Sequence, residues 1–223
     1  MKFNLYISNM KKILIIILIS VSLYVKSQKI DFNNFNSEIA TKVLAETFLN
    51  FRDTIDCYRS GQKWSENHPE ILLYPELTKP RWSEWVYKTI SLPNCRDMVS
   101  NPTTISYHID RSKWYEDNSK LIRKEFYKSY KDIPKILYES SFIDYVENVY
   151  TFYNCKLETY QELAERTIKN WDGSIRHSCA IRGLSHDVVA YEKYKLKIRT
   201  MFACCVLYSK ETKITRICLN FIE

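Results

Sequence analysis

Apolar residues between positions 37 and 58 recur at the spacing of one helical face. The members of this apolar face are Ile39, Val43, Leu44, Phe48, Phe51 and Ile55. Ser37 stands before them as a candidate N-cap, and Gly61 follows as a candidate helix stop. The pattern predicts a first helix over residues 37–58.

The next hundred residues give a less regular pattern. After Pro80, apolar residues up to Ile90 predict a short second helix with proline in its first turn. Residues 91–112 contain two prolines and little periodicity, which predicts a loop. Residues 113–130 carry an uneven apolar face, which predicts a third helix.

The second half of the chain alternates between strand and helix patterns. Residues 142–153 are rich in aromatic and β-branched side chains and predict an extended segment, whereas residues 157–171 keep a helical period throughout. Residues 188–191, 194–207 and 213–221 then predict closing antiparallel strands, with a turn at 209–212 between the last two. Helices early and a meander late predict an α+β domain with helices packed on an antiparallel sheet.

Composition fits one folded domain. The chain has 223 residues, 45% hydrophobic and 26% charged, which are ordinary values for a globular protein. It contains only three glycines, and this argues against a phosphate-binding loop or a dinucleotide fingerprint.

The first 27 residues have the pattern of an export signal. Lys11 and Lys12 precede an uncharged apolar run over residues 13–25, which Lys26 closes. The alternative is a membrane anchor, but spanning a bilayer takes about 20 apolar residues. We therefore expect a signal peptide over 1–27, a single mature domain over 28–223, and a secreted or extracytoplasmic location.

Removal of that segment changes the charge. It takes away four lysines and no acid, so the formal net charge falls from +7 to +3. A mild excess of this size predicts no nucleic-acid partner. After signal cleavage we also expect no stable membrane span.

All seven cysteines follow the predicted signal, which in an oxidising compartment predicts some disulfides and at least one remaining thiol. Cys204 and Cys205 are adjacent in a predicted strand, so their side chains point to opposite faces. They cannot both meet Cys218 across the hairpin, and one of them is expected to be a core thiol. The chain contains no pair of cysteines with C-x-x-C spacing, which argues against a zinc knuckle.

Three segments resemble, in order, motifs of the CAP family, the secreted domains named after cysteine-rich secretory proteins, antigen 5 and plant pathogenesis-related proteins. Residues 48–52 carry an asparagine and an arginine close together, as in the opening helix of the family. Residues 145–149 are similar to its G-E-N strand, with Val146 in place of glycine. Residues 164–177 are similar to the bacterial form of the domain (the SCP domain), in which a helix ending in tryptophan is followed by serine and histidine, as in W-x-x-x-S-P-G-H. Residues 91–140 match no part of it.

The resemblance implies an α-β-α sandwich with a surface cleft, in which two histidines and two glutamates can hold a divalent metal such as zinc. Glu147 and His177 stand at the matching positions, and His108 is the nearest upstream histidine. The second glutamate would follow Trp171, where the chain has Asp172 instead. The alternative is that Glu147 accepts backbone hydrogen bonds and that His177 caps a helix end or faces water.

These residues lead to three hypotheses about function. The first is a secreted CAP-type module that binds a small-molecule ligand, a lipid or an extracellular protein at a cleft near Glu147, His177 and His108, without turnover. The second is a metal-dependent hydrolase using the same cleft. The third is a structural, disulfide-stabilised extracellular protein without a small-molecule site. The first two require Glu147 and His177 to be neighbours at one hollow.

Overall fold

A computed structural model of the chain describes residues 28–54, 80–101, 120–121, 124, 145–182 and 201–222. The predicted signal peptide, the stop at Gly61, the strand at 188–191 and His108 lie outside the described residues. Of the predicted helix over 113–130, only residues 120, 121 and 124 are described, and all three are helical.

The described elements alternate between helix and strand along the chain. In order they are α2 (Ser37–Thr54), β1 (Arg81–Trp82), α5 (Glu84–Val86), the π-helix η2 (Tyr87–Ser91), α6 (Leu92–Ser100), β2 (Tyr145–Tyr153), α9 (Tyr160–Asp172), α10 (Ile175–Arg182), β3 (Met201–Ser209) and β4 (Ile214–Ile222).

The strands form one mixed sheet in the order β1-β3-β4-β2. The hairpin β3–β4 and the pair β2–β4 are antiparallel, whereas β1 is parallel to β3. The α+β class is therefore confirmed, but the prediction of a purely antiparallel sheet is wrong at β1. The long connection between β1 and β3 makes this parallel pairing possible.

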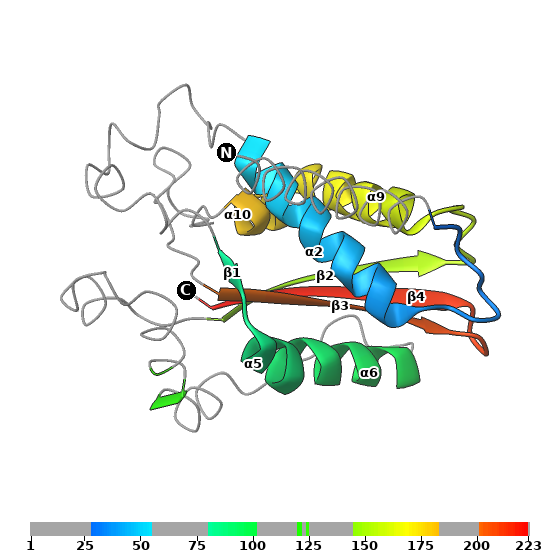
Figure 1. Ribbon diagram of the computed structural model, residues 1–223, viewed down its shortest axis with the longest axis horizontal. Helices are drawn as coiled ribbons and strands as arrows, with labels where there is room; N and C mark the ends of the chain where they lie inside the picture. Colours follow the sequence, from blue (N-terminus) through cyan, green and yellow to red (C-terminus); the bar gives the residue numbers. More distant parts are fainter. Residues whose placement is uncertain are drawn as a thin grey trace, which may run out of the picture.

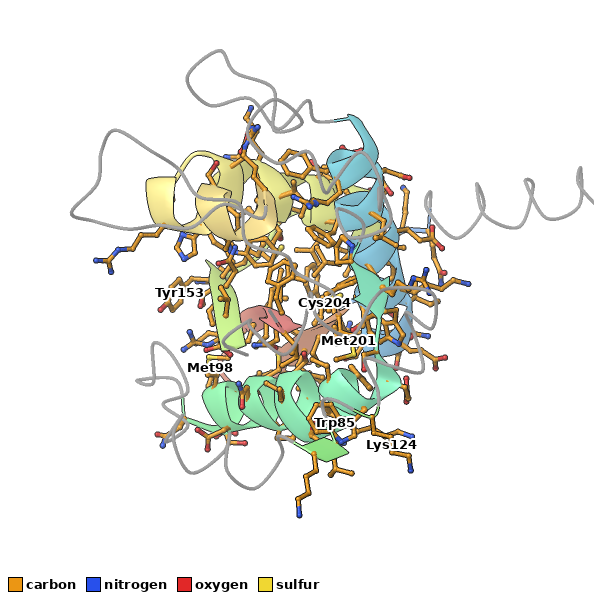
Figure 2. All side chains as sticks on the ribbon, turned by 90° about the vertical axis from the view of Figure 1, so that its left-hand side faces the viewer. Trp85, Met98, Lys124, Tyr153, Met201 and Cys204 are labelled. Carbon is orange, nitrogen blue, oxygen red and sulfur yellow. The ribbon has the colours of Figure 1, made fainter. Side chains whose placement is uncertain are left out.

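Helices lie on both faces of the sheet, as Figure 1 shows. Helices α2, α9 and α10 cover one face, called here the main-core face, and α5, η2 and α6 cover the other, called the α6 face. Figure 2 views the same layers along the sheet, with Met98 in the α6 layer and Tyr153 on β2.

The two helices with the clearest sequence pattern, α2 and α9, form as predicted and pack together. The N-cap of α2 is Asn36, one residue before the predicted Ser37, and its side-chain oxygen accepts from the Ile39 backbone N–H at 3.0 Å. Helix α9 begins at Tyr160, because the Thr159 hydroxyl accepts from the Glu162 N–H at 3.1 Å and caps the helix there.

The segment 80–101 differs from the sequence prediction in two ways. Residues 81–82 form strand β1 rather than the start of a helix, and the helix begins after Ser83, whose hydroxyl accepts from the Val86 N–H. The predicted loop from residue 91 is instead α6, with Pro93 in its first turn. The π-helix η2 leads directly into α6, and the Leu92 N–H bonds five residues back to the Tyr87 carbonyl. This wider turn leaves room for the proline ring in a continuous helix.

The largest core cluster lies on the main-core face. It joins Phe48 of α2 and Trp171 of α9 to Phe202 and Phe221 of the sheet, all fully buried or nearly so. Phe48 packs its ring against both phenylalanines, at centroid distances of 5.0 and 5.5 Å. A smaller cluster on the α6 face contains Met98 and three buried cysteines.

The predicted closing hairpin is present, and Cys204 and Cys205 point to opposite faces as predicted. The Cys204 thiol lies in the main core and donates to the Thr41 carbonyl at 3.4 Å, whereas Cys205 belongs to the α6 cluster. Both cysteines are buried free thiols, so the prediction of a core thiol is confirmed without distinguishing the two. In the described part of the chain, no helix has the length and apolar character needed to cross a membrane.

Candidate functional site

The candidate residue Glu147 lies in β2 directly opposite Asn220 of β4. Its Oε1 accepts from the side-chain amide of Asn94 at 2.8 Å and from that of Asn220 at 3.0 Å. The Ser91 hydroxyl donates to the Asn220 amide oxygen at 2.7 Å. We call these four residues the Glu147 cluster.

The Glu147 cluster joins helix to sheet. Ser91, Asn94 and Asn220 are fully buried, and they come from η2, α6 and β4. Buried amides need partners, and a carboxylate is a strong acceptor, so these bonds offset the loss of water around the group. This arrangement fits the alternative in which Glu147 accepts structural hydrogen bonds, although its donors are side-chain amides rather than backbone groups.

The neighbouring residue, Asn148, reaches the opposite face of the sheet. Its side-chain amide donates to the His177 carbonyl at 3.1 Å and so ties β2 to α10. Because successive side chains of a strand alternate between faces, Glu147 must lie on the α6 face. Its contact with Asn94 of α6 is direct evidence of that side.

The sequence predicted that His177 lies just beyond a helix end. In the structure it lies within α10. The Ser174 hydroxyl is 3.0 Å from its Nδ1, and Ser174 also accepts the first helical bond, from the Ser178 N–H. Burial lowers the pKa of His177, and the neighbouring Arg176 guanidinium lowers it further. The half-buried imidazole is therefore neutral at pH 7.

Helix α10 is fixed by an ion pair that the sequence analysis missed. Arg182 donates to both carboxylate oxygens of Asp172, each at 2.8 Å, and the Ser178 hydroxyl donates to Asp172 at 2.9 Å. Arg182 also lies over the Phe51 ring, 5.6 Å from its centroid. Asp172 thus holds α10 against the end of α9. The sequence does contain a signal for this ion pair. It places an aspartate at the end of one predicted helix and an arginine ten residues later.

The contacts described above place Glu147 and the helix of His177 on different faces of β2, so they do not support the shared hollow predicted for the two residues. Glu147 contacts Asn94 of α6 on one face of β2, whereas the next residue, Asn148, contacts the His177 carbonyl of α10 on the other face. The third predicted member, His108, lies outside the described residues. Among the residues that the structure describes, no group of three or more His, Cys, Asp or Glu side chains is arranged to hold a metal ion.

Comparison with protein-family models, with curated proteins and with solved structures finds no match to this chain.

Proposed function

We propose that the chain is an exported CAP-type module that binds an extracellular ligand without turnover. The proposal combines the export pattern of residues 1–27 with the order of the three family-like segments. Helices on both faces of an α+β sheet are consistent with an α-β-α sandwich of the CAP type.

The observation that carries the proposal is the separation of Glu147 from His177. A metal-dependent hydrolase at these positions needs both side chains at one metal with an open coordination position. Glu147 instead accepts two amide N–H groups on the α6 face, while His177 bonds to Ser174 on the main-core face. The binding role proposed next uses His177 without Glu147, and so differs from the cleft expected from the sequence, which needed both residues.

We assign the binding role to the corner formed by α9 and α10, called here the α10 corner. It contains a neutral, half-buried imidazole at His177, the hydroxyl of Ser174 and the exposed cation of Arg176. Such a set can donate to, and attract, a ligand with hydrogen-bond-accepting or anionic groups, such as a lipid headgroup or an acidic side chain of a protein. The Asp172–Arg182 pair holds this corner in place.

Export is tested by producing the full chain in a eukaryotic secretory host and determining the N-terminus of the protein in the medium. We expect a mature chain that begins near Ser27 or Gln28. An uncut chain retained in the membrane fraction would contradict export and support the anchor alternative.

Binding is tested with vesicles of phosphatidylcholine and an anionic phospholipid, by co-sedimentation of the secreted protein. We expect His177→Ala to weaken binding severalfold and Glu147→Gln to leave it unchanged, because the two residues lie on different faces. The same proteins are assayed for hydrolysis of p-nitrophenyl esters in the presence of Zn²⁺. Turnover that requires both residues would overturn the proposal in favour of the hydrolase.

A second candidate is the structural disulfide-stabilised extracellular protein, which would need cysteines that the structure holds as free thiols to be joined. Cys95, Cys205 and Cys218 meet in one buried cluster between α6 and the sheet. Vesicle binding that is absent in every variant, with export intact, would favour this second function.

A further inference from the structure

Three thiols meet on the α6 face, and neither proposed function so far uses them individually. Cys205 of β3 and Cys218 of β4 are direct register partners, and Cys95 of α6 lies against both. All three are fully buried. We call them the thiol cluster. The five cysteines whose side chains the structure describes are present as free thiols.

Cys95 is the member of the thiol cluster that links helix to sheet. Its Sγ lies 3.6 Å from the Cys205 carbonyl oxygen and 3.4 Å from that of Arg216. The thiols of Cys205 and Cys218 also act on the pKa of the Cys95 thiol. On β3, the backbone oxygen that it reaches belongs to Cys205 itself. On β4, the oxygen belongs to a residue two positions before Cys218.

Geometry distinguishes the possible pairs. Directly opposed residues of antiparallel strands hold their Cβ atoms about 4.5–5.5 Å apart, whereas a disulfide prefers about 3.8 Å. A Cys205–Cys218 bond would therefore draw two strands together against their backbone hydrogen bonds. A cysteine on a helix above the sheet can approach by a small movement of the helix.

We infer that Cys95 and Cys205 form a disulfide when the chain folds in an oxidising compartment. The inference rests on the proposed export, because thiols stay reduced in the cytosol. The bond would fasten α6 to β3 across 110 residues of sequence. Cys218 and Cys204 remain thiols, one on each face of the sheet.

The oxidant is a disulfide, for example glutathione disulfide. The thiolate of one cysteine attacks a glutathione sulfur, forms a mixed disulfide and releases one glutathione thiolate. The second cysteine, as its thiolate, then attacks the mixed disulfide, forms the Cys95–Cys205 bond and releases the second glutathione. Two electrons pass to the glutathione disulfide, and the two thiol protons leave with its products.

Burial determines when this chemistry can happen. It raises the pKa of Cys95 and of Cys218, while the hydrogen bond from Cys95 and then burial raise that of Cys205. Because the thiolate is the reactive form, oxidation belongs to folding, before α6 closes over the sheet. Once formed, the bond is shielded from reductants.

The test uses the mature chain, residues 28–223, refolded with reduced and oxidised glutathione, so that it does not depend on export. Remaining thiols are alkylated under denaturing conditions, and the protein is digested with trypsin. We expect a linked species joining residues 89–96 to residues 200–210. Alkylation of Cys95 in the refolded protein, or its linkage to residues 217–223, would overturn the assignment. Failure of secretion in the full chain would instead contradict the proposed function alone.

Variants separate the two cysteines that share one tryptic peptide. Cys205→Ala should abolish the linked species, whereas Cys204→Ala should retain it, because Cys204 faces the opposite side of the sheet. The reverse result would overturn the pairing. If either variant does not fold, fragmentation of the wild-type linked peptide between its two adjacent cysteines gives the same decision.

Discussion

The two faces of the sheet are packed by different chemistry, although the same strands supply both. The main-core face is built around the larger apolar cluster, which joins aromatic side chains of α2 and α9 to the hairpin, and it also buries polar side chains such as Thr41 and Asn148. The α6 face combines the Glu147 cluster, the thiol cluster and the buried Arg216, whose guanidinium donates to Thr151. Apolar burial is non-directional, whereas polar and thiol groups must meet specific partners. We therefore expect the first face to dominate stability and the second to fix the position of α6.

The largest effect should come from the main-core face. Replacing Phe48 with Ala removes a ring packed against Phe202 and Phe221. The free energy of unfolding should fall by about 3–5 kcal/mol, measured by urea denaturation. Tyr153→Ala is the control, because this side chain is 67% exposed and its loss should cost less than about 0.5 kcal/mol. Equal losses in the two variants would remove the contrast between core and surface.

An intermediate effect is expected on the α6 face. Glu147→Leu deprives the buried amides of Asn94 and Asn220 of their common acceptor, which should cost about 1–3 kcal/mol in urea denaturation. Glu147→Gln keeps an acceptor oxygen and should cost less. If Glu147→Leu left stability unchanged, the Glu147 cluster could not be what holds α6 on the sheet.

A smaller effect is expected at the α10 corner, because its ion pair is partly exposed. Asp172→Asn weakens the paired bonds from Arg182, and we expect a loss of about 1 kcal/mol in thermal or urea unfolding. Arg182→Lys should have a similar effect, since an ammonium cannot bond both carboxylate oxygens in the same geometry. High salt should reduce the difference from wild type. A loss as large as that of Phe48→Ala would mean that this corner belongs to the main core.

The smallest effect concerns pH. Burial and Arg176 lower the pKa of His177 in the folded chain below its ordinary 6.5. The unfolded chain therefore takes up this proton first, so stability is full above pH 6.5 and falls as the pH drops toward the folded pKa. His177→Gln should flatten this part of the curve, measured as the urea midpoint from pH 7.5 to 5.5. A steeper fall in the variant would contradict the assignment.

The sequence predicted only part of the candidate site, because it does not say which face of the sheet each helix covers. Strand parity alone puts Glu147 and Asn148 on opposite faces, but nothing in the sequence says which face carries α10. The family-like motif suggested that Glu147 and His177 converge, and the contacts of Asn94 and Asn148 place them apart. Motif spacing carries no information about which side of a sheet a later helix will cover.

The elements with a strong local pattern could be predicted from the sequence alone. Helices α2 and α9 follow from long periodic faces, and the closing hairpin, with Cys204 and Cys205 on opposite faces, follows from alternation around a turn. Only the tertiary structure decided the other elements. Helix α6 forms despite Pro93 because the π-helix η2 precedes it. Strand β1 forms because its two residues pair with β3. Local patterns record what one segment prefers, whereas the partners of Cys95, Glu147 and His177 depend on where distant segments meet.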